Sequence, residues 1–330
     1  MTPEEFWTTN KPHLSANSHR SYTSTTKKLM TLMDEEFNEG SIDSMVNKRF
    51  DLFTLIGNYN INTAKNYYNV MCEMCRVGYT GENKPSILED IIEHRNAASD
   101  IYRQGVQAHK YTEKQQDKII NWEEVLSVRL TLEQDVKRLH IRKKITHDKN
   151  LTDAELGVFQ DLVLVSLYTH LPPVRNDYAF VKVITPNNYS ALSKDERMAS
   201  NWLLVAKGWM EIRLHQFKTS KVYGEIVLPV PKSLKLLLRY WLRINGSGIL
   251  LLNRNNEPLS ENGISKYLTR IFVNHTGKKV SSTMLRHIFL SSEFGEEIRK
   301  ELEGYSYKKD IADSMGHSVA TQKDYVKVAD

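Results

Sequence analysis

A polar stretch of twelve residues, YTEKQQDKIINW from Tyr111 to Trp122, separates two parts of this chain that differ in hydrophobic pattern. The stretch is charged, and its start is short of large apolar side chains. The chain has 330 residues, a length typical of two domains. We therefore predict a first domain over residues 1–112, a linker over 113–122 and a second domain over 123–330.

The first part carries the spacing of amphipathic helices. Over residues 14–110 apolar side chains recur three to four positions apart, as in Leu29, Leu32, Met33 and Phe37. Side chains at this spacing lie on one face of a helix. We expect a small helical bundle that buries these faces against one another.

Between residues 177 and 230, the residue pattern of the second part changes from that of helices to that of strands. Three stretches, DYAFVKVI, NWLLVAKGWMEIRL and YGEIVLPVP, are rich in β-branched and aromatic residues and are separated by turns. They predict a small antiparallel sheet, in which HQFKTSKVYG, from His215 to Gly224, is the hairpin between the last two strands. Helical patterns precede and follow this region. We expect a mainly α chain with a small antiparallel sheet in an α+β second domain.

The two cysteines, Cys72 and Cys75, form a single CEMC motif. Without a second pair at zinc spacing, we expect no metal site. They share the apolar side of a predicted helix with Tyr67, Met71 and Met74, where cysteine packs as a small hydrophobic side chain. This use of cysteine suits a reducing interior.

Charge and targeting signals narrow the compartment and the partner. The net charge of +5 is a mild basic excess, which is consistent with a polyanionic partner. The first residues, MTPEEFWTTN, lack the basic start and the apolar run of a signal peptide. No apolar run approaches the roughly 18 residues of a membrane span. We expect an intracellular protein that is neither secreted nor membrane-bound.

Several familiar chemistries are missing from the sequence, which has no phosphate-cradling glycine-rich loop, no GxSxG elbow and no HExxH. Five residues of the second part remain as candidates. They are Arg175, Lys218, Arg286, His317 and Tyr325. Taken alone, each has an ordinary structural interpretation, which is, in the same order, a helix cap, a solvated charge, an ion-pair partner, a core histidine and a packing tyrosine.

Taken together, the order of these residues is distinctive. An arginine in LPPVRNDY is followed by the lysine of QFKTSK, then by Leu-Arg-His, Gly-His-Ser and a tyrosine. This order resembles the tyrosine recombinase (phage integrase-like) family. The resemblance is close over residues 120–330 and looser over the helical first part, which resembles the core-binding domain of that family.

The resemblance implies a role for each basic residue, and the physical chemistry of phosphodiester cleavage fits it. Arg175 and Arg286 would each bind non-bridging phosphate oxygens through charge-assisted, forked hydrogen bonds. Lys218 matches the hairpin lysine that protonates the leaving 5′ oxygen as a general acid. Lys221, three residues on, is the fallback for that role.

The remaining two residues would carry the covalent step. Tyr325 matches the nucleophile, whose phenolic oxygen forms a 3′-phosphotyrosyl link that conserves the energy of the broken bond. His317 would donate a hydrogen bond to the phosphate or to the tyrosine oxygen. The resemblance therefore implies an enzyme that uses no ATP, no metal and no other cofactor.

The motif around the second arginine departs from the family pattern. Thr283 stands three residues before Arg286, where the family commonly has a histidine. Threonine is a poor proton acceptor but hydrogen-bonds a phosphate, so the general base stays open. His287 follows Arg286 directly, and one helical step turns it about 100° away. We expect His287 to be a buried structural partner.

Two further departures concern the first arginine and the tail. Asp177 lies two residues after Arg175, whereas the family usually has its acid at three, so we expect Asp177 to orient Arg175 through an altered turn. His317 and Tyr325 are eight positions apart, slightly closer than is usual. Five residues follow Tyr325 in this sequence. We expect subunit contacts to be short there or to be made elsewhere.

The partner implied by the resemblance is double-stranded DNA, with a homotetramer on paired DNA sites. Lys27, Lys28 and Lys221 are candidate DNA contacts, and a virus or another mobile element is a plausible source by family habit. A type IB topoisomerase-like nicking-closing enzyme and a DNA-binding module that has lost turnover are the alternatives. A purely structural helical protein explains none of the ordered motifs.

Overall fold

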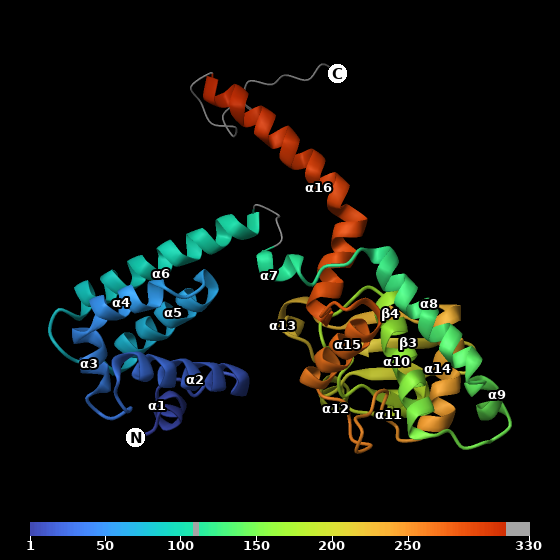
Figure 1. Ribbon diagram of the computed structural model, residues 1–330. Helices are drawn as coiled ribbons and strands as arrows, with labels where there is room; N and C mark the ends of the chain where they lie inside the picture. Colours follow the sequence, from blue (N-terminus) through green and yellow to red (C-terminus); the bar gives the residue numbers. More distant parts are fainter. Residues whose placement is uncertain (108–111, 315–330) are drawn as a thin grey trace, which may run out of the picture. The chain divides into compact units, whose positions relative to one another are not determined.

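The computed structural model describes residues 1–107 and 112–314 of the chain. The chain divides into two compact units, Met1–Tyr111 and Thr112–Asp330. Each unit has its own hydrophobic core. The units are described separately below (Figure 1).

The first unit is helical, as the sequence predicts. Its core includes the fully buried indole of Trp7, whose Nε1 donates a hydrogen bond of 2.9 Å to Thr26 Oγ1. Cys72 and Cys75 lie buried on the inner face of their helix, and burial raises the pKa of the Cys72 thiol to about 11. Both cysteines therefore pack as hydrophobic side chains. The helices are α1 Pro3–Asn10, α2 Ala16–Met33, α3 Ser41–Asn47, α4 Arg49–Gly57, α5 Ile61–Gly78 and α6 Lys84–Gln107.

The second unit combines helices with one sheet. Thr152 and Glu155 form a reciprocal capping box at the start of α10, as their spacing predicts. The helices are α7 Glu113–Gln116, α8 Trp122–Arg138, α9 Ile141–Thr146, α10 Asp153–His170, α11 Pro186–Ala191, α12 Lys194–Met198, α13 Ser220–Tyr223, α14 Lys232–Asn245, α15 Glu261–Thr276 and α16 Ser282–Ser314. The strands are β1 Lys182–Ile184, β2 Trp202–Val205, β3 Met210–Leu214 and β4 Ile226–Pro229.

The sheet has the order β1-β2-β3-β4 and is mixed rather than antiparallel. β2, β3 and β4 pair antiparallel as predicted, but β1 pairs parallel with β2. The cause is the connection between β1 and β2, which contains α11 and α12. These helices carry the chain back before β2 begins, and parallel neighbours need such a crossover. The connection between β3 and β4 contains α13.

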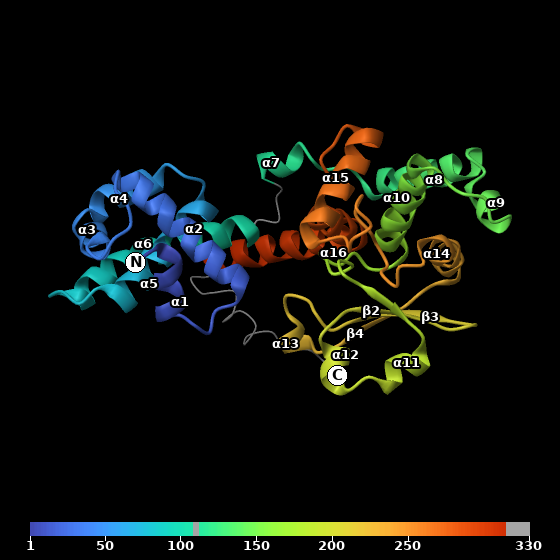
Figure 2. The same cartoon turned by 90° about the horizontal axis from the view of Figure 1, so that it is seen from below.

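The two faces of the sheet are covered unequally. Figure 2 shows α10 and α14 on one side and α11 and α12 on the other. Leu203 and Ile212 face the main core of the unit, whereas Trp202 and Leu204 face a small cluster with Tyr189 of α11. The side with the small cluster also carries the polar side chains of Glu211 and Arg213 from β3, which pair with Leu204 and Trp202 in the sheet register.

In residues 1–107 and 112–314, no helix combines the length and the apolar character that crossing a membrane requires.

Candidate functional site

The fold brings the two predicted clamp arginines together, although they are far apart in the sequence. Arg175 is exposed in the loop that follows α10, and Arg286 is half-buried near the start of α16. The pKa of Arg286 is lowered, first by burial and next by the positive charge of Arg175. Each guanidinium therefore lies within the electrostatic field of the other. Such a pair of cations is suited to bind an anion.

Hydrogen bonds to Asn176 hold the Arg175 loop against the helices that flank it. Ser282 Oγ, at the first position of α16, donates to Asn176 Oδ1 at 2.6 Å. Ser265 Oγ of α15 accepts from Asn176 Nδ2 at 3.2 Å. Ser282 is 2% exposed, and Arg286 lies one helical turn beyond it on the same face. The bond thus fixes where Arg286 emerges relative to Arg175.

Asp177 stabilises the backbone of this loop. Its Oδ2 accepts a hydrogen bond of 3.1 Å from the backbone amide of Arg175. Burial raises the pKa of the Asp177 carboxyl, and the Arg175 amide and the charges of Arg175 and Arg286 oppose that rise. Asp177 therefore contacts Arg175 through the main chain, two residues away, and completes the cluster with one negative charge.

A buried tyrosine closes the base of the loop. Tyr168 of α10 donates from its hydroxyl to the backbone carbonyl of Arg175. Its ring packs edge-on against Tyr178, with the ring centroids 5.2 Å apart. Both tyrosines are fully buried, and burial is the main cause that raises their pKa values well above the usual range. They act as rigid hydrophobic supports of the loop.

Lys218 lies four residues after the end of β3 and is exposed. The residues just before it are linked to the arginine loop by Asn201, which directly precedes β2. Asn201 Nδ2 donates to the carbonyl of Asp177 at 3.0 Å, and Asn201 Oδ1 accepts from the amide of Gln216 at 2.7 Å. In the sequence, Asn201 stands only as the first residue of NWLLV. An asparagine directly before a strand is also typical of a turn, so this position does not indicate a link to the arginine loop.

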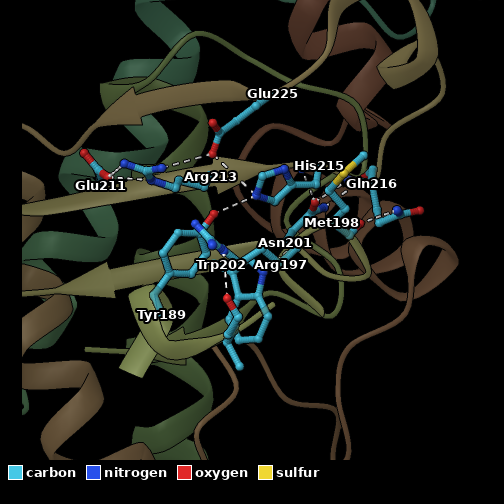
Figure 3. A network of polar contacts seen from close by, with 11 residues as sticks. Tyr189, Arg197, Met198, Asn201, Trp202, Glu211, Arg213, His215, Gln216 and Glu225 are labelled. Carbon is cyan, nitrogen blue, oxygen red and sulfur yellow. Dashed lines mark hydrogen bonds and ion pairs between the residues drawn. The ribbon is translucent and has the colours of Figure 1, made fainter. Parts of the chain in front are cut away.

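A polar network surrounds His215 at the end of β3 (Figure 3). His215 Nε2 lies 3.0 Å from the Tyr189 hydroxyl and 3.4 Å from Glu225 Oε1. Arg213 pairs with Glu211 and Glu225 beside it. Burial lowers the pKa of His215, while Glu225 opposes that effect.

The network borders an open pocket of about 670 Å³. Lys194, Arg197 and Lys221 line it together with His215 and Glu225. Lys221 lies on α13 and is exposed. The connection between β3 and β4 therefore carries two exposed lysines, Lys218 and Lys221, of which Lys221 lines the pocket.

Two of the supporting residues lie on α16. Thr283 is exposed next to Ser282. The prediction that His287 is buried is wrong, because His287 is exposed. The buried face of this part of the helix is taken by Met284, Leu285 and Ile288. Arg286 stands at the edge of that face, and a further step of about 100° brings His287 to solvent.

The other predicted residues lie elsewhere or cannot be placed. Lys27 and Lys28 are exposed on α2 of the first unit. His317 and Tyr325 lie outside the described residues. Over residues 1–107 and 112–314, no group of three or more His, Cys, Asp or Glu side chains is arranged to hold a metal ion.

No protein-family profile matches this chain, and no curated protein matches it. Among solved structures, the chain is similar to the XerH site-specific recombinase bound to difH substrate in a pre-cleavage complex. That match has 13% identity and a TM-score of 0.44, over 84% of this chain and 70% of the other. It is also similar to the XerA recombinase, with 13% identity and a TM-score of 0.33, over 99% of this chain and 92% of the other.

Proposed function

We propose that this protein cleaves and rejoins duplex DNA as a tyrosine recombinase, through a covalent 3′-phosphotyrosyl intermediate on Tyr325. The observation that carries the proposal is the convergence of Arg175 and Arg286, two guanidiniums that share one electrostatic environment. The two positive charges repel each other, and the single carboxylate of Asp177 beside them offsets only part of that charge, so the cluster favours binding of a further anion such as a phosphate.

The chemistry follows from the charges on the scissile phosphodiester. Arg175 and Arg286 bind the non-bridging oxygens and stabilise the charge that develops in the transition state. As the phenol of Tyr325 loses its proton to water and its oxygen bonds phosphorus, the bond to the 5′ oxygen breaks, and Lys218 gives that oxygen a proton. Rejoining is the reverse reaction, and it needs no ATP because the phosphotyrosyl bond retains the energy.

The supporting residues have smaller roles in this scheme. Asp177 fixes the Arg175 loop through its bond to the backbone amide. Thr283, exposed one residue after Ser282, hydrogen-bonds the phosphate in place of a histidine. His317 bonds the phosphate or the tyrosine oxygen. None of these roles involves a metal ion or an organic cofactor.

The proposed partner is double-stranded DNA inside the cell. Exposed Lys27 and Lys28 of the first unit and Lys221 of the second unit contact phosphates, so affinity falls as salt rises. Strand exchange between two duplexes requires four active sites, so a homotetramer assembles on paired DNA sites.

Covalent capture tests the proposal. The substrate is a library of duplexes, randomised around a nick placed just beyond the scissile position. Cleavage releases a short fragment, so rejoining fails and the covalent protein–DNA adduct accumulates. The wild-type chain forms the adduct, and the Arg286→Ala variant does not.

A DNA-binding module without turnover is the second candidate. The observation that favours it is Thr283, which cannot replace a histidine as proton acceptor. If the wild-type chain binds the library but gives no adduct, this second candidate is correct. If it relaxes supercoiled plasmid without recombining paired sites, the activity is that of a type IB topoisomerase.

A further inference from the structure

Asn201 is a buried amide with every hydrogen-bonding position in use. Asn201 is 5% exposed. Oδ1 accepts from the backbone amides of His215 at 2.9 Å and Gln216 at 2.7 Å. Nδ2 donates to the carbonyls of Asp177 at 3.0 Å and Gln216 at 2.9 Å. Figure 3 shows Asn201 beside His215 and Gln216 at the end of β3.

The four bonds connect two segments that the proposed reaction uses. Asp177 belongs to the loop of Arg175, and Gln216 lies two residues before Lys218. Asn201 itself is anchored, because its carbonyl accepts from the amide of Lys182 in β1 at 2.9 Å. The side chain of Asn201 therefore sets the separation between the Arg175 loop and the segment that precedes Lys218.

The two segments depend on Asn201 to different degrees. The Arg175 loop has other anchors, in the Ser282–Asn176 bond and the bond from Tyr168 to the Arg175 carbonyl. The segment before Lys218 receives three of the four Asn201 bonds, and its other polar anchors are side-chain bonds of His215 to Tyr189 and of Gln216 to the Met198 carbonyl. Lys218 is exposed and makes no ion pair within the described part of the chain. Loss of Asn201 therefore releases Lys218 more than it releases the arginines.

We propose that Asn201 is a positioning residue that holds Lys218 at the distance from the arginine clamp that proton transfer requires. This inference rests on the proposed function. A general acid must lie within hydrogen-bonding reach of the atom it protonates. A lysine side chain is long and has many rotamers, so the position of its backbone decides how often it reaches that atom.

The test compares two leaving groups. In one duplex the scissile bond is to the ordinary 5′ oxygen, and in the other a sulfur atom replaces that oxygen. A thiolate leaves without receiving a proton, because thiols are far more acidic than alcohols. A variant that has lost only proton transfer therefore cleaves the sulfur duplex well. The quantity measured is the ratio of sulfur to oxygen cleavage rates, relative to that of the wild-type chain.

For Lys218→Ala we expect this ratio to rise by about 100-fold or more. For Asn201→Ala we expect a rise of at least about tenfold, with the rate on the sulfur duplex close to that of the wild type. Asn201→Asp keeps the side-chain volume and the acceptor oxygen. If Asn201→Ala fails to fold, Asn201→Asp takes its place, and we expect its ratio of sulfur to oxygen cleavage rates to exceed that of the wild type.

Gln160→Ala is the matched control. Gln160 is also a buried amide that joins two distant segments, with bonds of 2.9 and 3.0 Å to the backbone of Leu252. Its loss costs comparable stability but leaves the ratio at the wild-type value. If the sulfur duplex restores cleavage by Lys218→Ala but restores it for neither Asn201 variant, the inference is overturned. If the wild-type chain cleaves neither duplex, the proposed function fails instead.

Discussion

The hydroxyl of Ser282 donates a hydrogen bond of 2.6 Å to the side-chain oxygen of Asn176, and this bond joins segments that are 106 residues apart in the chain. One of these segments carries Arg286 and the other carries Arg175. The bond is part-buried, and Ser282, which is itself buried, lies one helical turn before Arg286. It links the two segments that carry the arginines of the proposed clamp.

Ser282→Ala should therefore affect both stability and cleavage. Removing the hydroxyl takes away the closest hydrogen-bond donor of Asn176 Oδ1, which costs about 1–3 kcal/mol in the free energy of unfolding. We expect the cleavage rate to fall about tenfold, because a misplacement of the clamp weakens transition-state binding. Denaturant unfolding and single-turnover cleavage measure the two effects.

Thr152→Ala is the control for Ser282→Ala, since it removes a helix cap at the start of α10 and costs about 1 kcal/mol. It should leave cleavage unchanged. Equal cleavage by the two variants would show that the Ser282 bond contributes only stability.

Arg175→Ala and Arg286→Ala should abolish cleavage while leaving most of the affinity for DNA. Loss of one charge-stabilising donor costs about 100-fold or more in rate. Binding is distributed over many phosphates, so the dissociation constant should change only several-fold. Arg138→Ala, which removes an exposed ion pair with Asp135 on α8, is the matched control. A collapse of DNA binding in either clamp variant would contradict the assignment.

The His215 network predicts a pH dependence of stability. Burial lowers the folded-state pKa of His215 below its ordinary value of 6.5, so the unfolded chain binds the proton more tightly. The stability contribution is therefore present above pH 6.5 and is lost as the pH falls below it. Glu225, Arg213, Arg197 and the Tyr189 hydroxyl are the polar groups around the ring.

His215→Gln should accordingly lose less stability than the wild-type chain between pH 7 and pH 5. Urea unfolding at each pH measures this difference. His147→Gln changes an exposed histidine and should follow the wild-type curve. A His215→Gln curve parallel to that of the wild type would exclude His215 as the source.

The two units should unfold separately. Trp7→Ala empties a fully buried site in the first unit and costs about 3–5 kcal/mol there. Trp241→Ala is the matched change in the second unit, where the indole donates to the carbonyl of Leu250 at 2.7 Å. Amide hydrogen exchange should report lost protection over residues 1–107 for the first variant and over 122–290 for the second. Loss over both ranges in either variant would contradict independent units.

Local signals in the sequence predict much of this fold. The capping box of Thr152 and Glu155 and the apolar face of Cys72 and Cys75 depend on residues three or four apart, so spacing reveals them. The parallel pairing of β1 was missed because DYAFVKVI predicts one long strand. Only its last part, Lys182–Ile184, extends, and the helices that reverse the chain follow it.

The sequence predicts the charged residues of the site but not the residues that hold them in place. Arg175 and Arg286 stand in motifs that can be read from the sequence, and the fold brings them together. Asn201 and Ser282 act through partners that are distant in the chain, at Asp177 and Asn176. Such contacts follow from the tertiary structure alone. The burial of His287 was wrongly predicted for the same reason, since a helical pattern does not say where its buried face ends.

The identity of the nucleophile is the central claim, and covalent capture tests it most directly. The wild-type chain should form an adduct with the nicked duplex, and mass spectrometry of the digested adduct should place the nucleotide on the peptide that contains Tyr325. Tyr305→Phe, which changes an exposed tyrosine of α16, should form the adduct like the wild type. Tyr325→Phe should form none. An adduct in Tyr325→Phe, or a nucleotide attached to any other residue, would contradict the account.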